Sequence, residues 1–236
     1  MAIYCQDMER RSFVKIVEKA GLKFFCRPGP GWDDEYCVDE VIERNVYEIE
    51  PDDIRDKIVV DIGANIGTFS LFASKYAKKV YSYEPGPTNF DMLKMNIALN
   101  KITNIEAFNV AVGKPGEDTI EPDSSGHSRI GSAGGLNGVP VKVIGFDEIP
   151  TDEIYLLKMD CEGGEYDVVK YASDEKLKKV NKILGELHSW IFESEEYQEE
   201  HKRMIEKLEK HFTMRYTGFK NSVFWGIKRD EYQGIR

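Results

Sequence analysis

The stretch from Lys57 to Glu84 constrains the fold of this chain more than any other part of the sequence. It begins with an apolar run at 58–60, which is typical of a strand that is buried on both faces of a sheet. Two glycines four residues apart, Gly63 and Gly67, then precede a helical pattern. A second β-rich run ends at Glu84. This order predicts a β–α–β unit with a small-residue turn after its first strand and a carboxylate after its second.

The spacing within this unit indicates an adenosine-containing ligand that has no pyrophosphate. Gly63 and Gly67 allow a close approach of the backbone to a ligand, and the amides that open the helix point toward an electronegative group. Glu84 is placed to accept hydrogen bonds from both hydroxyls of a ribose. A dinucleotide fingerprint that starts at Gly63 would need glycines where Asn65 and Thr68 stand, and a phosphate loop would need a Gly-Lys pair that is missing. Such a ligand therefore fits better than NAD or ATP.

Three motifs along the chain together resemble one known family. The first reads Asp-Ile-Gly-Ala-Asn-Ile-Gly-Thr-Phe at 61–69 and is followed by Tyr-Glu-Pro at 83–85. The others are Ala-Val-Gly at 111–113 and Leu-Lys-Met-Asp-Cys-Glu-Gly-Gly-Glu at 157–165. This set is similar to the FkbM-type family of S-adenosylmethionine-dependent methyltransferases, which belong to class I. Asn65, where most class I members carry glycine, supports this narrower resemblance.

The resemblance implies S-adenosyl-L-methionine as the cofactor and a small or sugar-like hydroxyl as the methyl acceptor. The expected cofactor-binding residues follow the first three strands and the later apolar strand: Asp61, Gly63, Ala64, Asn65, Gly67, Thr68, Glu84, Pro85, Asn109, Ala111 and Asp160. Alternatives remain for some of them. Asp61 can cap the amides that follow its strand as well as shape the site, and Asn109 and Ala111 can be ordinary packing residues.

Candidates for catalysis follow two later strands. Asp160 ends the apolar run 154–159 and His188 follows the run 182–187, so both should reach the carboxyl edge of the sheet. An alcohol must lose its proton to become a good nucleophile, and His188, with an ordinary pKa of about 6.5, is the candidate base. A histidine that ties neighbouring loops together is the alternative. Glu162 is the third candidate, although it can be only a helix-entry charge.

The same three side chains suit a divalent metal, but the sequence predicts none. Carboxylates and imidazole are ligands for several divalent ions. No H-x-H or H-x-x-x-H spacing, however, is present around Asp160, Glu162 or His188.

Charge and composition restrict the partners and the compartment. The 236 residues include 32 basic and 42 acidic ones, and a net charge of −10 disfavours a nucleic-acid substrate. The sequence has no apolar stretch of membrane-spanning length and no signal-peptide pattern, and its cysteines form no C-x-x-C pair. We therefore expect a cytoplasmic enzyme with a small-molecule acceptor and no membrane partner. A cofactor-binding module without transfer activity and an RNA methyltransferase remain the alternatives, and the oligomeric state stays open.

The order of the elements predicts an α/β fold, with a doubly wound, Rossmann-like, mostly parallel sheet and a C-terminal antiparallel hairpin at about 215–229. Residues 1–50 are expected to form an N-terminal helical cap or extension, with a helix at 8–20 that Gly21 ends. Residues 51–236 are expected to form the methyltransferase domain. Within it, 105–112 reads as the third strand, and the Gly-, Ser- and Pro-rich residues 114–138 read as a long loop or lid.

Overall fold

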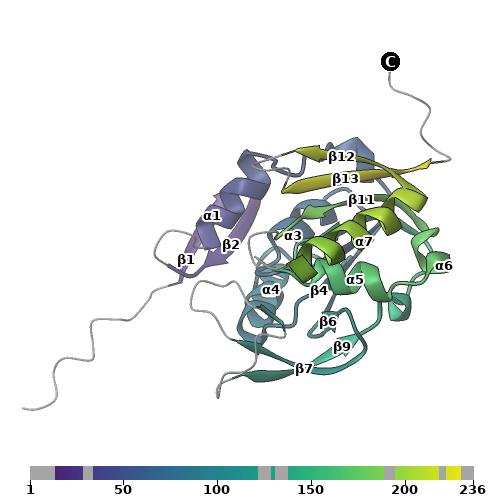
Figure 1. The fold of residues 1–236 in the computed structure, drawn as a ribbon. Helices are drawn as coiled ribbons and strands as arrows, with labels where there is room; N and C mark the ends of the chain where they lie inside the picture. Colours follow the sequence, from purple (N-terminus) through teal and green to yellow (C-terminus); the bar gives the residue numbers. More distant parts are fainter. Residues whose placement is uncertain are drawn as a thin grey trace, which may run out of the picture.

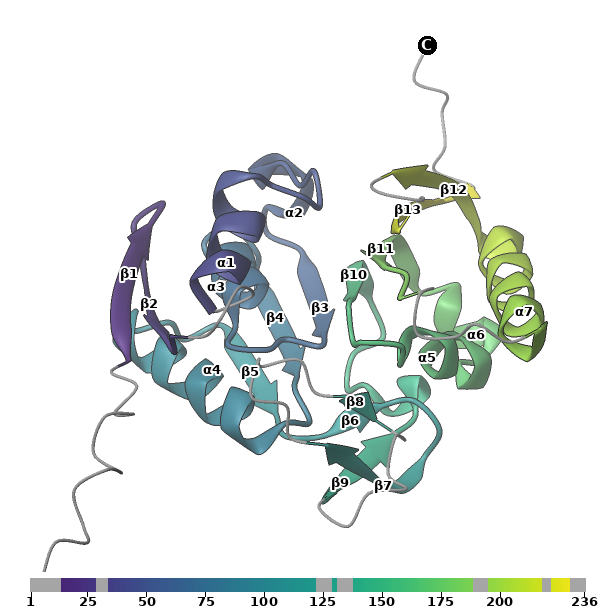
Figure 2. The ribbon, with the colours of Figure 1, turned by 60° about the vertical axis from the view of Figure 1, so that its left-hand side comes forward.

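A seven-stranded sheet forms the centre of the protein (Figures 1 and 2). The computed structural model describes residues 14–28, 34–121, 129–130, 138–188, 195–217 and 222–229. The strands of this sheet are β3 (Ile58–Ile62), β4 (Lys79–Tyr83), β5 (Ile105–Phe108), β10 (Ile154–Met159), β11 (Val180–Glu186), β12 (Phe212–Thr217) and β13 (Val223–Lys228). Their order is β12-β13-β11-β10-β3-β4-β5.

The pairing of these strands confirms the predicted fold class. The strands β5, β4, β3, β10 and β11 pair in parallel, whereas β13 runs antiparallel to both of its neighbours, β11 and β12. The last two strands therefore form the predicted C-terminal hairpin, and β13 is inserted between β11 and β12. The carboxyl ends of the parallel strands meet at one edge, where open α/β sheets bind their ligands.

Helices cover both faces of the sheet (Figure 2). On one face lie α2 (Pro51–Ile54), α3 (Thr68–Ser74) and α4 (Pro87–Leu99), and on the other α5 (Glu165–Tyr171), α6 (Asp174–Leu177) and α7 (Glu195–His211). Alternate residues of the central strands point to opposite faces. Those in the core with α5 and α7 include Val60, Leu157 and Ile183. Those in the core with α3 include Val59, Leu156 and Leu184. No helix within the described ranges is long and apolar enough to span a membrane.

The N-terminal segment differs from the helical cap that the sequence predicts. Residues 8–13 of the expected helix lie outside the described ranges, and the next residues form an antiparallel hairpin of β1 (Lys15–Lys19) and β2 (Leu22–Cys26). Ala20 and Gly21 join the strands with φ angles of 48° and 75°, and two positive φ angles are typical of a tight hairpin turn. Gly21 therefore lies in a hairpin turn and does not end a helix, and alternate residues of the strand that follows it, β2, are buried. The helix α1 (Asp34–Val38) and the π-helical turn η1 (Asp39–Glu43) follow.

The expected third strand and the expected loop also differ from the structure. The predicted strand 105–112 is divided between β5 and β6 (Ala111–Val112), and β6 belongs to a second sheet with the order β6-β9-β7-β8. The other members are β7 (Gly116–Glu121), β8 (Arg129–Ile130) and β9 (Val139–Ile144). Part of the expected loop 114–138 is therefore strand, because β7 pairs with β9 and buries Ile120. Residues 122–128 and 131–137 of that loop lie outside the described ranges.

A buried ion pair joins β3 to β10 near the carboxyl edge. Lys158 Nζ lies 3.0 Å from Asp61 Oδ1, and the two side chains are 4% and 0% exposed. The same Nζ donates a hydrogen bond of 2.8 Å to the carbonyl oxygen of Gly63. Gly63 has a φ of 79°, and a Cβ at this position would lie only 1.9 Å from the carbonyl oxygen of Asp160. The turn after β3 therefore requires glycine and is tied directly to the end of β10.

Removing the cation of this pair should destabilise the protein far more than removing an exposed one. In Lys158→Met the buried Asp61 carboxylate loses its counterion, which we expect to lower the free energy of unfolding by about 3–5 kcal/mol. The matched control is Lys79→Met, because Lys79 pairs with Glu106 at 2.9 Å on the surface and should cost less than about 1 kcal/mol. Urea denaturation measures both. Equal losses in the two variants would contradict the role of the buried pair.

Candidate functional site

Glu84 connects the turns that follow β3 and β4. Its carboxylate is 4% exposed and accepts hydrogen bonds of 2.8 Å from the backbone amides of Asn65 and Gly86, one on each oxygen. Burial raises the pKa of Glu84 to about 7, although these two hydrogen bonds act in the opposite direction. The side chain of Asn89 also hydrogen-bonds to this carboxylate, whose two oxygens together have about four lone-pair directions, so capacity for a ligand hydroxyl remains. The geometry is therefore consistent with the predicted ribose-binding role.

Two polar atoms in the segment that joins β3 to α3 have no hydrogen-bond partner in the described structure. They are Asn65 Oδ1 and Thr68 Oγ1, and both atoms are buried. A buried polar atom without a partner carries an energetic cost, which a bound ligand with suitable hydrogen-bond donors would remove. These atoms are the strongest sign in this region that a polar ligand belongs here.

Several other predicted cofactor residues serve to shape the turns. The amides of Gly63 and Ala64 both donate to the carbonyl oxygen of Tyr83 at 3.0 Å. Asn109 Nδ2 donates to the carbonyl oxygens of Glu84 and Pro85, each at 2.9 Å. These contacts hold the two turns in register with each other.

Asp61, Gly67 and Ala111 also have structural roles. Asp61 is fully buried and accepts a hydrogen bond of 2.6 Å from Ser70 Oγ in addition to its ion pair with Lys158. Gly67 precedes α3 with a φ of 94°. Ala111 is buried in β6 and pairs with Val143 of the second sheet. Packing is therefore the better interpretation of Ala111.

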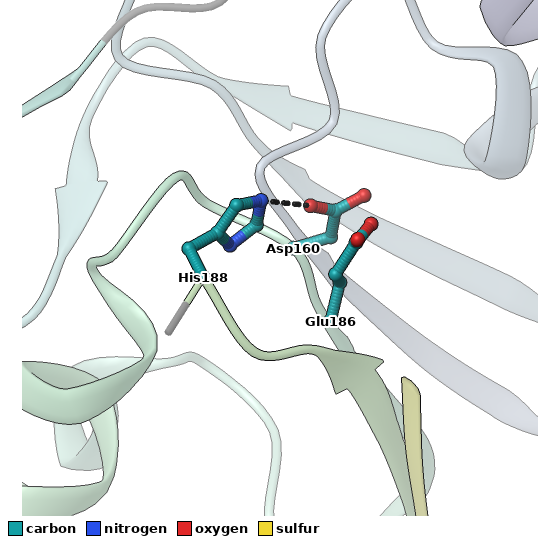
Figure 3. A group of neighbouring side chains, drawn as sticks. All are labelled: Asp160, Glu186 and His188. Atoms are coloured by element: carbon teal, nitrogen blue, oxygen red, sulfur yellow. Dashed lines mark ion pairs between the residues drawn. The ribbon is translucent and has the colours of Figure 1, made fainter. Parts of the chain in front are cut away.

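A second group of charged side chains lies where β10 and β11 end (Figure 3). Asp160 follows β10, Glu186 ends β11, and His188 lies two residues further on. One oxygen or nitrogen atom of each side chain lies within 4.8 Å of those of the other two. His188 Nε2 is 3.6 Å from Asp160 Oδ1 and 3.5 Å from Glu162 Oε2. The structure thus brings the three predicted catalytic residues together and adds Glu186 to them. We call these four residues the acidic–imidazole cluster.

Buried neighbours hold the acidic–imidazole cluster in place. The carboxylate of Glu165 is fully buried and lies 3.0 Å from His188 Nδ1. It accepts hydrogen bonds from the amides of Cys161 and Gly163 at 2.7 Å and 3.0 Å. The hydroxyl of Tyr47 donates to Asp160 Oδ2 at 2.5 Å. Hydrogen bonds from neighbouring residues, such as those of Glu165 and Tyr47, orient functional side chains.

The charges of the cluster change which group can act as a base. Burial opposes a charged imidazole at His188, but the hydrogen bond to Glu165 and the carboxylates of Asp160 and Glu162 outweigh it and raise the pKa to about 10. His188 is then an imidazolium at neutral pH, which disfavours the role of base that the sequence suggests. Burial and the charge of Asp160 raise the pKa of Glu186 to about 7, close to the optimum for a base at neutral pH.

Sequence reasoning missed three residues of this region. Glu186 stands two residues before His188, and this spacing was a usable signal because alternate residues of a strand share a face. Lys158 interrupts the apolar run 154–159, and a lysine inside a buried strand indicates a charged partner. Tyr47 is 113 residues from Asp160 in the chain, and nothing in the local sequence around it indicates this contact.

Comparison with known proteins identifies the family. The methyltransferase FkbM domain matches residues 61–217, which include both groups of side chains. Over 205 residues the chain is 25% identical to Methyltransferase 1 of Beauveria bassiana (strain ARSEF 2860), which covers 73% of this chain and 82% of that protein. Over 93 residues it is 46% identical to a probable ribosomal RNA small subunit methyltransferase A of Methanosphaera stadtmanae, covering 39% of this chain and 32% of that protein.

A solved structure shares the fold. The crystal structure of methyltransferase FkbM from Methylobacillus flagellatus KT superposes with a TM-score of 0.50 at 18% identity. The match covers 73% of this chain and 43% of that one, so the chain spans less than half the length of this structural relative. Because the family match extends over more than half of the sequence, the chain belongs to the FkbM methyltransferase family.

Proposed function

We propose that this methyltransferase uses S-adenosylmethionine and methylates a hydroxyl group of a small or sugar-like molecule in the cytoplasm. The observation that carries the proposal is the position of Glu84, a buried carboxylate beside a glycine turn that itself contacts the end of β10. A nucleoside held at Glu84 would therefore lie next to the acidic–imidazole cluster. Membership of the FkbM family supports both the cofactor and the reaction type.

The residues around Glu84 fit this cofactor. Glu84 would accept hydrogen bonds from the ribose hydroxyls, while Asn65 Oδ1 and Thr68 Oγ1 offer acceptors to donors elsewhere on the ligand. Asn109 keeps the turn at Glu84 and Pro85 in place. Gly63 brings the backbone of this site against Asp160. Residues of this chain would thus bind the cofactor, orient it and place it next to the acceptor site.

The acidic–imidazole cluster is the proposed place for the acceptor. When bound, S-adenosylmethionine supplies a methyl carbon to the acceptor oxygen, the carbon–sulfur bond breaks with its electron pair left on sulfur, and the hydroxyl proton is released. Carboxylates at the ends of β10 and β11 are positioned to receive that proton. Asp160, Glu162 and His188 remain the proposed catalytic residues, but His188 would act as a cation that orients the carboxylates and not as the base, and Glu186 joins them.

An RNA acceptor is the second candidate. It is favoured by the partial identity to the probable ribosomal RNA methyltransferase of Methanosphaera stadtmanae, which covers only 39% of this chain. The net charge of −10 and the carboxylates of the proposed acceptor side disfavour a polyanion there. A small hydroxylated acceptor is therefore the preferred hypothesis.

Transfer of a labelled methyl group decides between these acceptors. We expect radioactivity from methyl-labelled S-adenosylmethionine to enter members of a panel of hydroxylated metabolites and sugars, and not total or ribosomal RNA. Incorporation into RNA alone would favour the second candidate. A protein that binds the cofactor but labels neither class would be a binding module without transfer activity.

Loss of the Glu84 carboxylate should weaken cofactor binding. Hydrogen bonds to a charged group contribute about 1.5–3 kcal/mol, so Glu84→Ala should lower the affinity for S-adenosylhomocysteine by roughly ten- to hundredfold. Glu106→Ala is the matched control, because Glu106 is an exposed acid on the neighbouring strand β5. Calorimetry that finds the same affinity in Glu84→Ala and in the unmodified protein would rule out the ribose assignment, as would comparable binding of NAD.

The same titration should depend on pH. The raised pKa of Glu84, about 7, means that its carboxylate gains a proton as the pH falls through neutrality. The ionised form is the better acceptor of two hydroxyls, so affinity should fall about tenfold between about pH 8 and about pH 6. Glu84→Gln, which has no such titration, should bind weakly with a flat profile over this range. An equally flat profile in the unmodified protein would contradict this account.

A further inference from the structure

Three side chains of the acidic–imidazole cluster have the spacing of metal ligands (Figure 3). The distance of 3.6 Å from His188 Nε2 to Asp160 Oδ1 exceeds the usual range of an N–H···O hydrogen bond. Two ligand atoms that each lie about 2.1 Å from a tetrahedral ion are themselves about 3.4 Å apart. The ligand atoms of Asp160, Glu186 and His188 all lie within 4.8 Å of one another, so small side-chain rotations would bring them around one ion.

The imidazole is already oriented as a ligand, and a metal ion at Nε2 would replace the proton that makes His188 an imidazolium in the metal-free protein. His188 is 4% exposed, and its Nδ1 lies 3.0 Å from the fully buried carboxylate of Glu165. Both oxygens of Glu165 accept hydrogen bonds from backbone amides, so the position of this carboxylate is fixed. It therefore accepts a hydrogen bond from the N–H at Nδ1 of His188. Nε2 is thereby left facing Asp160 and Glu162. In metal sites, the histidine nitrogen that does not bind the metal commonly donates a hydrogen bond to a carboxylate.

The carboxylate of Asp160 is also held in the orientation of a ligand. Tyr47 donates its hydroxyl to Oδ2 of Asp160, while the other oxygen, Oδ1, is the one that faces His188. The carboxylate is therefore held with one oxygen directed at the imidazole. Two of the three candidate ligands thus each have a buried partner that fixes the atom they present.

The charge balance at this edge favours a cation. Four carboxylates, those of Asp160, Glu162, Glu165 and Glu186, surround the imidazole of His188. Lys158 lies 3.9 Å from Asp160, but it is closer to Asp61, with which it pairs at 3.0 Å. A divalent ion between the side chains would offset the repulsion among these converging carboxylates.

We propose that Asp160, Glu186 and His188 bind a first-row divalent transition-metal ion such as Mn²⁺ or Zn²⁺. Imidazole with two carboxylates is a donor set that suits these ions, and three protein ligands leave a position open for a further oxygen. The sequence alone predicts no metal, because it contains no closely spaced histidines. The fold supplies the ligands instead from the ends of two neighbouring strands.

The role of the ion rests on the proposed function. An acceptor hydroxyl in the open position would be oriented toward the cofactor site and would lose its proton more readily. With Asp160 and Glu186 bound to the ion, the nearby carboxylate of Glu162 would receive that proton in their place. Metal binding itself does not depend on that role, because the ligands are residues of this chain. It can therefore be measured with neither cofactor nor acceptor present.

Titration of the metal-free chain of 236 residues with Mn²⁺ tests the site, with calorimetry for affinity and electron paramagnetic resonance for the bound ion. We expect one Mn²⁺ per chain, and Glu186→Gln and His188→Ala should each lower the affinity at least about a hundredfold. Tyr47→Phe, which removes only the contact that holds Asp160, should lower it about tenfold. Zn²⁺ should compete with Mn²⁺ for the site.

Two controls match the ligand variants. His211→Ala removes another histidine that pairs with a carboxylate, that of Asp174 at 3.0 Å, and Glu106→Gln removes another partly exposed acid. Both should bind Mn²⁺ like the unmodified protein. If His188→Ala does not fold, as judged by circular dichroism, Glu186→Gln decides the question, because it preserves the size of the side chain.

The outcomes separate this proposal from the proposed function. Mn²⁺ affinity that is equal in the unmodified protein, Glu186→Gln and Glu106→Gln would overturn the metal site, whatever the cofactor does. Specific Mn²⁺ binding without any binding of S-adenosylhomocysteine would support the metal site and count against the proposed cofactor.

Discussion

The buried ion pair between Asp61 and Lys158 is the interaction on which the rest of the site depends. Two charges at 4% exposure or less are costly to take out of water, and here each has a further hydrogen bond, to Ser70 Oγ and to the carbonyl oxygen of Gly63. The pair links the two central strands β3 and β10 near the edge where ligands bind. It thereby holds the glycine turn against the end of β10, and no larger residue fits that contact.

This constraint places two chemically different regions side by side. The region around Glu84 contains several hydrogen-bond acceptors. Two of them, Asn65 Oδ1 and Thr68 Oγ1, have no partner within the described residues. In the acidic–imidazole cluster, charged side chains lie close together, and Tyr47 and Glu165 contact Asp160 and His188 and hold them in place. A methyltransferase needs one region that holds the methyl donor and another that aims the acceptor and removes its proton. The two regions meet where Gly63 contacts Asp160.

Local patterns predicted the β–α–β unit and the terminal hairpin, because each depends on residues that are close in the sequence. The order of the elements along the chain predicted the mostly parallel sheet, although its strands β3 and β10 are far apart in the sequence. Gly21 was misinterpreted because glycine is common both at the ends of helices and in hairpin turns, and the alternating burial of β2 becomes visible only in the fold. The strand β7 was not predicted because most of its residues are polar, and the one buried apolar residue, Ile120, gives no alternating pattern. Within the site, Glu84 followed from spacing, whereas the contact of Tyr47 with Asp160 joins segments far apart in the chain.

A crystal structure of the protein with S-adenosylhomocysteine would test the central claim most directly, namely that the two regions form one continuous methyl-transfer site. The account predicts that both ribose hydroxyls contact the carboxylate of Glu84 and that the sulfur atom faces Asp160 and His188. A ligand bound elsewhere, or one bound at Glu84 with its sulfur directed away from the acidic–imidazole cluster, would contradict it.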